Sequence, residues 1–240
     1  MKERVKNIIK NELTGWKSLE VAWLAIATAV IIGLSIYWED TLMGIISAAT
    51  GVACVVCTGK GKLSAYLFGL VNCVLYAIIA FQATYYGETL LNVIYYIPMQ
   101  FVGFAVWSKN MNSETNEVKK VHMKMHQRLL CLLAMIVATF LGGLFLKYLG
   151  DAMPFVDSFT TIASVFAMIL SVKMFSEQWW IWVAVDVFSV YMWAVNFMSG
   201  GENLSTLLMW LVYLGNAVIM LVKWEKEAHE NKEKEKSNAI

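Results

Sequence analysis

The stretch YGETLLNVIYYIPMQFVGFAVW, which runs from Tyr86 to Trp107, decides the fold class of this sequence. Its only charged residue lies near the beginning, and the rest is long and apolar enough to cross a bilayer core about 30 Å thick as one helix. Polar residues recur in it at intervals of four, so their side chains share one face of that helix. These residues are Glu88, Asn92, Tyr96 and Gln100. The stretch therefore predicts a membrane-spanning helix with one polar stripe.

The composition of the whole chain extends this interpretation. Of its 240 residues, 59% are hydrophobic and 15% are charged, whereas about 25% are charged in a typical soluble domain. Eight stretches have the length of a membrane span, and they cover residues 21–38, 41–58, 63–82, 88–107, 129–146, 156–172, 179–198 and 203–222. The net charge of +1 gives no bulk basic field to recruit nucleic acid. All four cysteines lie in apolar runs, which argues against both a disulfide framework and a zinc site.

The basic residues predict how the spans are oriented. If the N-terminus is cytoplasmic, every lysine and arginine except Lys147 falls on the cytoplasmic side, as the positive-inside rule requires. Losing or gaining one span would destroy this asymmetry, so we expect eight spans with both termini in the cytoplasm. The leader (1–20), a loop (108–128) and a charged tail (223–240) then face the cytoplasm. We expect the tail to be a solvated or fraying segment without a fold.

An internal repeat organises the spans. A shift of 114 residues lays 41–107 over 156–222 with the span boundaries in step, and it brings Asn72 onto Asp186. Because the single span 129–146 joins the two units, both enter the membrane from the same side. Such parallel repeats are a transporter plan with the substrate held near the midplane, and they predict alternating access by rocking of one unit against the other. The predicted fold is therefore an all-α membrane protein, with the extra span 21–38 preceding a 3+1+3 core.

Polar residues gather at one depth in four of the spans. Asp186 is the only formally charged residue deep within a span, where an ionisable group costs at least about 2.5 kcal/mol unless its surroundings are polar. Residues at a similar depth are Asn72, Tyr96, Gln100, Tyr213 and Asn216. We expect them to line a cavity. The alternative is that they form hydrogen bonds between packed helices, worth about 0.6 to 2 kcal/mol each. Pro98 predicts a bend beside this site.

The character of these side chains limits the ligand. Amides, phenols and indoles bind sugars and flat rings, whereas a phosphate calls for arginine or lysine, which the predicted spans lack. We expect a ligand that is neutral or cationic, planar in part and not phosphorylated. A cationic ring would gain from an aromatic face such as Trp182 and from Asp186.

Three motifs resemble the PnuC family of bacterial vitamin transporters. They are Gly69-x2-Asn72-x3-Tyr76, the stretch Tyr86–Trp107 quoted above, and QWWIWVAVD from Gln178 to Asp186. The resemblance covers roughly residues 41–223, and its most specific part is the second motif. It implies a fold similar to SWEET sugar transporters, a homotrimer with one path per protomer, and a place in the bacterial cytoplasmic membrane. It also implies facilitated diffusion of nicotinamide riboside without an ATPase or a cofactor, followed by trapping through a cytoplasmic kinase.

The resemblance also assigns substrate-lining residues, which are Asn72, Tyr76, Asn92, Tyr96, Gln100, Trp182, Asp186 and Asn196. The polar stripes add Glu88, Tyr213 and Asn216 as candidates. Relatives with this fold carry thiamine, riboflavin or deoxynucleosides, so the substrate is less firmly implied than the family. The extra span 21–38 departs from the seven-helix core, and the resemblance gives it no role.

Other classes of function fit less well. An intramembrane hydrolase or a metal enzyme would need a base or a ligand set in the bilayer, but all three histidines lie outside the spans. His122 and His126 have helical metal-ligand spacing, yet on a lysine-rich loop without a third ligand they are more typical of a solvated surface. A proton-coupled carrier is the stronger rival, with Asp186 titrating in the membrane and Glu88 or Glu202 at the outer mouth. A structural or receptor role would predict no solute flux.

Overall fold

The computed structural model describes residues 12–83, 86–112, 115–148, 150, 154–200 and 204–238, and every regular element in these ranges is a helix. The helices are α2 (Ser18–Tyr37), α3 (Leu42–Lys60), α4 (Ser64–Gln82), α5 (Tyr86–Leu90), the π-helix η1 (Leu91–Tyr96), α6 (Ile97–Lys109), α7 (Met125–Tyr148), α8 (Pro154–Val172), α9 (Gln178–Met198) and α10 (Leu204–Asn238). With α5, η1 and α6 counted as one, eight helices among the described residues are long and apolar enough to cross a membrane, as predicted.

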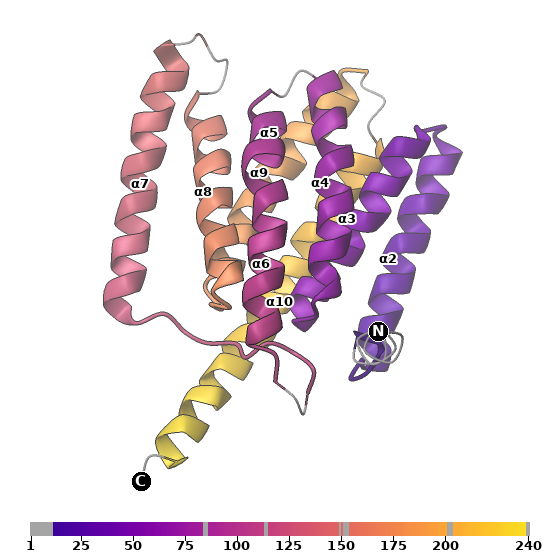
Figure 1. The fold of residues 1–240 in the computed structure, drawn as a ribbon. Coiled ribbons are helices and arrows are strands. Elements are labelled where there is room, and N and C mark those ends of the chain that lie inside the picture. The colour runs from indigo at the N-terminus through magenta and orange to yellow at the C-terminus, as the bar shows by residue number, and fades with distance from the viewer. Residues whose placement is uncertain are drawn as a thin grey trace.

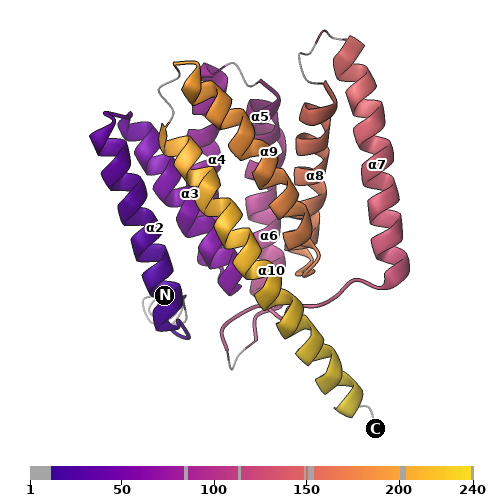
Figure 2. The ribbon, with the colours of Figure 1, turned by 180° about the vertical axis from the view of Figure 1, so that it is seen from behind.

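Six of these spans form a closed ring. Neighbouring contacts run from α3 to α4, α6, α8, α9 and α10, and α10 returns to α3. The other two spans lie outside the ring at opposite edges, where α2 packs on α3 and α10 and α7 packs on α8 (Figures 1 and 2). This arrangement is compatible with two three-helix units joined by α7, with α2 as the extra helix. The parallel symmetry of the two units stays a prediction.

Capping residues and hydrogen bonds at the turns determine where helices of the ring begin and end. Thr41 caps α3 by accepting a hydrogen bond from the backbone N–H of Gly44 at 3.0 Å. Gly61 ends the same helix in the left-handed region, with φ at 81°. Asp40, in the turn between α2 and α3, accepts hydrogen bonds from the backbone N–H and the hydroxyl of Ser205 in the first turn of α10. The turn after α2 thereby connects the extra helix to the second half of the chain.

The span that contains Pro98 changes its winding. Pro98 has no backbone N–H to donate to the carbonyl four residues earlier, and the six residues from Leu91 to Tyr96 are wound as a π-helix. In this segment the N–H of Ile97 donates to the carbonyl of Asn92, five residues back. The span thus has a wider helical turn before Pro98, which carries the side chains of Asn92 and Tyr96, and the bend itself stays a prediction.

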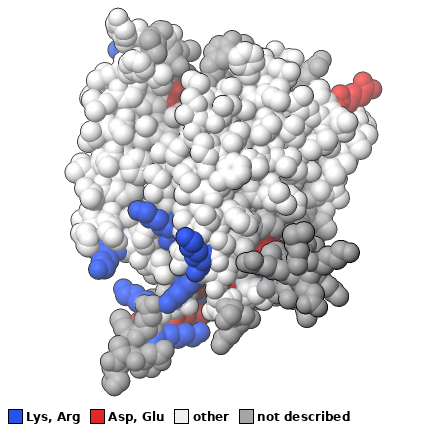
Figure 3. Space-filling model, in the orientation of Figure 1, with Lys and Arg blue, Asp and Glu red and all other residues white. Residues whose placement is uncertain are grey.

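Basic residues gather at one end of the bundle (Figure 3). We call it the lysine-rich end: it contains the turn between α3 and α4, the segment between α6 and α7, and the projecting end of α10 (Figure 1). The positive-inside rule predicts that it faces the cytoplasm.

The expectation that the tail has no fold is wrong, because α10 continues as a helix to Asn238. Contacts hold its first turns beyond the bundle: Ala228 is buried, and Asn231 donates to the backbone oxygen of Lys120 at 2.9 Å.

Candidate functional site

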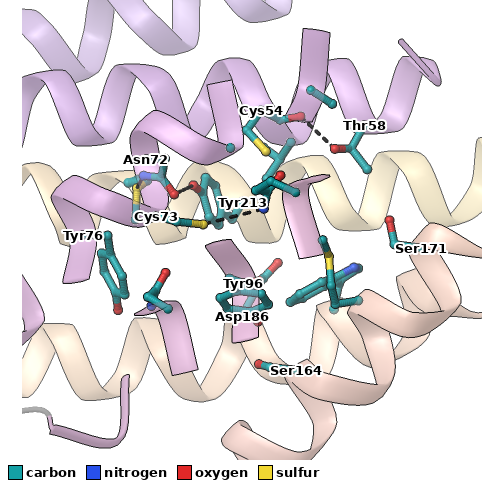
Figure 4. A pocket seen from close by; sticks show the side chains of 18 of the residues that line it. Cys54, Thr58, Asn72, Cys73, Tyr76, Tyr96, Ser164, Ser171, Asp186 and Tyr213 are labelled. Carbon is teal, nitrogen blue, oxygen red and sulfur yellow. Dashed lines mark hydrogen bonds between the residues drawn. The ribbon is translucent and has the colours of Figure 1, made fainter. Parts of the chain in front are cut away.

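The ring of helices encloses a cavity of about 130 Å³, far larger than the 10–15 Å³ needed for one water molecule. All six spans of the ring contribute to it, and among the described residues none from α2 or α7 does. Its lining consists of Cys54, Val55, Thr58, Ala65, Tyr66, Gly69, Asn72, Cys73, Tyr76, Glu88, Asn92, Tyr96, Gln100, Ser164, Met168, Ser171, Trp179, Trp182, Asp186, Met209, Trp210, Tyr213 and Ala217. Figure 4 shows labelled side chains from several of these helices around one space.

One hydrogen-bonded pair bridges the cavity wall from α4 to α10. The hydroxyl of Tyr213 donates to Oδ1 of Asn72 at 3.5 Å (Figure 4). The amide nitrogen of Asn72 donates to the backbone oxygen of Ser47 on α3 at 2.9 Å. These bonds fix the orientation of the Asn72 amide and leave part of its hydrogen-bonding capacity for a ligand.

The carboxylate of Asp186 is placed differently. Asp186 is 3% exposed, and within the described residues none donates a hydrogen bond to it or pairs with it. It therefore presents an uncompensated polar group to the cavity. Burying such a group without a partner is unfavourable, so a cation or hydrogen-bond donor in the cavity would be stabilised there. The second carboxylate on the cavity is that of Glu88, and among the residues that the structure describes no lysine, arginine or histidine lines it.

The amide of Gln100 lies opposite a small residue. Its Nε2 contacts Sγ of Cys73 at 3.6 Å, a weak hydrogen bond, and its Oε1 faces the backbone of Gly69, where a Cβ atom would be only 2.5 Å away. Gly69 thus leaves the room that Gln100 occupies. In the stripe above it, the side chain of Asn92 donates to the backbone oxygen of Glu88 at 2.8 Å.

The structure brings most predicted site residues together. Those that line the cavity are Asn72, Tyr76, Glu88, Asn92, Tyr96, Gln100, Trp182, Asp186 and Tyr213. The amide of Asn216 is instead fully buried and donates to the backbone oxygen of Val55 at 3.1 Å, which makes it a packing contact between α10 and α3. Asn196 shares the predicted face of α9 but lies in the last turn of that helix, and it does not line the cavity.

Two stripes of lining residues escaped the sequence analysis. α8 contributes Ser164, Met168 and Ser171, and α3 contributes Cys54, Val55 and Thr58. The residues of α8 recur at steps of four and three, and on α3 Cys54 and Val55 lie four and three residues before Thr58, so helical spacing was the available signal. Their small or sulfur-containing side chains are equally common in packed helix interfaces.

Comparison with known proteins gives concordant results. Residues 41–226 match the family model described as "Nicotinamide mononucleotide transporter". Over 90% of its length the chain is 38% identical to the nicotinamide riboside transporter PnuC of Neisseria mucosa, covering 85% of that protein. Over 89% of its length it is 32% identical to the PnuC protein of the same description from Haemophilus influenzae, covering 92% of it.

One solved structure, a crystal structure of the vitamin B3 transporter PnuC, superposes with a TM-score of 0.83 at 36% identity. The match covers 92% of this chain and 97% of that one. These relatives are membrane transporters, not enzymes. These matches confirm the resemblance seen in the three motifs. The chain belongs to the PnuC family, whose members are recognised by the nicotinamide mononucleotide transporter model.

Proposed function

We propose that this protein takes up nicotinamide riboside across the bacterial cytoplasmic membrane. The relatives with the highest identity quoted above are described as transporters of the riboside, whereas the family model is described by the mononucleotide, which carries a phosphate in addition. The charges of the cavity favour the riboside, because the described part of its lining contains the carboxylates Glu88 and Asp186 and no cationic side chain. This charge set is the observation that carries the proposal.

A phosphate about 4 Å from a carboxylate is repelled by roughly 4 kcal/mol per pair of unit charges at an effective dielectric constant near 20. The positive pyridinium ring of the riboside would instead be attracted by Asp186 and by aromatic faces such as Trp182. The amides of Asn72, Asn92 and Gln100 would bind the ribose hydroxyls.

We further propose facilitated diffusion, with the riboside trapped by a cytoplasmic kinase that adds a phosphate. The phosphorylated product would be repelled by the same two carboxylates, which would prevent its return. Each chain encloses its own cavity, which supports one path per protomer in the homotrimer implied by the resemblance.

A proton-coupled carrier is the second candidate, because Asp186 and Glu88 are groups in the cavity that can take up a proton. Uptake into proteoliposomes separates the two mechanisms. Passive transport predicts that the internal riboside concentration rises to the external one and no further, with or without a pH gradient. Accumulation above the external concentration under an imposed gradient would establish coupling.

The substrate itself is tested in the same proteoliposomes and by thermal stability. We expect nicotinamide riboside to enter and to raise the melting temperature, because a ligand that binds the native state stabilises it. The mononucleotide should do neither, and thiamine and riboflavin serve as competitors of other chemistry. Equal uptake of the mononucleotide would refute the charge argument.

A further inference from the structure

Gly51 lies on α3, one turn after Ser47, and its Cα is next to the hydrogen-bonded side chains of Asn72 and Tyr213. It does not line the cavity itself. A Cβ atom at this position would lie 2.8 Å from Nδ2 of Asn72 and 2.7 Å from Sδ of Met209, and it would overlap the hydroxyl oxygen of Tyr213 still more closely. Ordinary contacts between heavy atoms are about 3.5 to 4.0 Å, so a side chain at position 51 would displace the pair.

We propose that Gly51 is a positioning residue for the substrate, because its missing side chain fixes where the Asn72–Tyr213 pair stands in the cavity wall. This inference rests on the proposed function. A misplacement of about 1 Å, even one caused by a mutation far from the reacting groups, can cost an enzyme about 100-fold in rate. The residue thus acts through two cavity side chains, without touching the ligand.

A double-mutant cycle tests the proposal. Gly51→Ala is expected to raise the KM for nicotinamide riboside about tenfold, which is less than the roughly 100-fold that a 1 Å misplacement can cost an enzyme. Tyr213→Phe removes the oxygen that meets the new methyl group. Adding Gly51→Ala to Tyr213→Phe should therefore cost clearly less than adding it to the wild type. Gly33→Ala on α2, where a Cβ meets open space, is the matched control.

The outcomes separate the two claims. A wild-type protein that binds no riboside would refute the proposed function before any variant is compared. If the wild type binds and Gly51→Ala has the same KM, or if the two substitutions act independently, Gly51 is not a positioning residue. If Gly51→Ala alone does not fold, folding and binding of the double variant support the proposal, and its failure to fold overturns it.

A second, independent observation concerns the lysine-rich end of the cavity. Tyr66 and Trp179 line the cavity, and beyond them lie Trp107 and Trp224, which are both fully buried. The rings are in contact, with centroids 5.1 Å apart for Tyr66 and Trp107 and 5.8 Å apart for Trp179 and Trp224. Trp224 also donates to the backbone oxygen of Gly59 at 2.8 Å. These four aromatic side chains form a floor between the cavity and the lysine-rich end.

Residues 115–124 lie against this floor. Val118 is 2% exposed and packs in one cluster with Trp107 and Trp224. Its N–H donates to the backbone oxygen of Gly61 at 3.1 Å, and the N–H of Val121 donates to that of Met174 at 3.1 Å. The segment is therefore attached both to the turn between α3 and α4 and to the turn between α8 and α9.

A closed circuit of ion pairs holds the same segment. Its members alternate between glutamates and lysines. The N···O distances are 2.8 Å for Glu20–Lys60, 3.0 Å for Lys60–Glu117, 2.6 Å for Glu117–Lys120, 2.7 Å for Lys120–Glu227, 4.0 Å for Glu227–Lys223 and 2.8 Å for Lys223–Glu20. The circuit connects α2, α3, the segment and α10. The side chains of Lys60 and Lys120 are only 5% and 4% exposed, so losing a partner would leave a poorly solvated charge.

We propose that residues 115–124 are a latch on the exit of the cavity at the lysine-rich end, locked by Glu117. Opening this exit requires the aromatic floor to part, and the segment tied beneath it prevents that while Glu117 holds Lys60 and Lys120. The extra helix α2 takes part through Glu20. The proposal assumes a path through the cavity, but its test needs no substrate and is independent of which ligand is carried.

Cysteines already in the cavity provide the readout. In a background with Cys57→Ser and Cys131→Ser, a membrane-impermeant maleimide can label only Cys54 and Cys73, which line the cavity. Glu117→Gln keeps the shape of the side chain and removes its charge. We expect it to increase the labelling rate several-fold in vesicles that expose the lysine-rich end and to leave the rate from the other side unchanged. Glu230→Gln, an exposed carboxylate on α10, is the control.

An unchanged labelling rate in folded Glu117→Gln would overturn the latch. If that variant cannot be purified, Val118→Ala decides the question by the same measurement, because it loosens the contact with the floor without leaving a charge unpaired. A labelling rate in Val118→Ala equal to that of the parent would then contradict the proposal.

Discussion

Aromatic rings lie at both ends of the cavity, the lysine-rich end and the opposite one, but the two sets of rings are held by different forces. At the opposite end Trp193 donates to the hydroxyl of Tyr76 at 3.0 Å, and Trp210 lies against Tyr76 with the ring centroids 6.1 Å apart. At the lysine-rich end the rings rest on a segment that the circuit of ion pairs ties to α2, α3 and α10.

This difference separates two uses of charge in one molecule. The carboxylates of Glu20, Glu117 and Glu227 are satisfied by lysines, so they contribute to structure and add little net field. Those of Glu88 and Asp186 face the cavity, and no cationic residue lines it within the described ranges of the chain, so these two carboxylates are left to act on a ligand. Removing charges from each group in turn tests whether the two groups of carboxylates differ in this way.

Removing Glu20 should have the largest effect, because this carboxylate pairs with Lys60 and with Lys223, both at 2.8 Å. Breaking a buried ion pair costs about 3–5 kcal/mol, and we expect Glu20→Ala to lower the free energy of unfolding by about 3 kcal/mol, because Lys60 keeps Glu117 as a partner. Denaturant titration in detergent measures it. The exposed Glu230→Ala should stay within about 0.5 kcal/mol of the wild type. Equal stability of the two variants would show that the circuit contributes nothing.

Removing the charge of Asp186 should change binding more than folding. Asp186→Asn keeps the size of the side chain, and we expect it to weaken binding of the cationic riboside about tenfold, or about 1.4 kcal/mol. The reduced, uncharged form of the riboside should bind both proteins alike, since it gains nothing from a carboxylate. Calorimetric titration with both forms measures this. An equal loss of affinity for the two forms would assign Asp186 a structural role.

Removing an aromatic face should have a smaller effect. Trp182 lines the cavity, and Trp182→Ala is expected to weaken riboside binding by about 1 kcal/mol, the usual value of a stacking contact beyond simple burial. Trp180 on the same helix is 62% exposed on the outer surface, so Trp180→Ala is the matched control. Affinities measured by the same titration should differ between the two variants. If they are equal, Trp182 does not stack on the ligand.

The sequence predicts the spans and much of the polar part of the cavity wall, because amides, phenols and a lone aspartate are costly in lipid and their depth can be counted. It fails where side chains suit lipid and cavity equally. Ser164, Met168 and Cys54 carry no such cost, so nothing in their type separates a cavity wall from a packed interface. Asn216 shows the converse: its depth fits the predicted cavity, but its amide is used by the backbone oxygen of Val55 on a neighbouring helix.

Sequence patterns also fail to predict the ion-pair circuit, but for a different reason. Glu20 and Lys223 lie 203 residues apart, and they meet only because α2 packs on α10. The charged tail was expected to be unfolded because charge runs seldom bury apolar surface. Its first turns are helical because Glu227 and Asn231 find partners on the segment between α6 and α7.

The smallest expected effect is that of pH on the stability that Glu117 contributes at the lysine-rich end. Burial alone would raise the pKa of Glu117, but Lys120 and Lys60 outweigh it and hold the pKa below its usual value of 4.5. A carboxylate with a lowered pKa in the folded protein contributes stability that is present above its unfolded pKa and is lost as the pH falls through the folded one. The difference in melting temperature between wild type and Glu117→Gln should therefore be constant from pH 8 to about pH 6 and shrink only below about pH 4.5. A difference that vanishes between pH 8 and 6 would mean that the lysines do not hold Glu117, and that the exit responds to mild acidification.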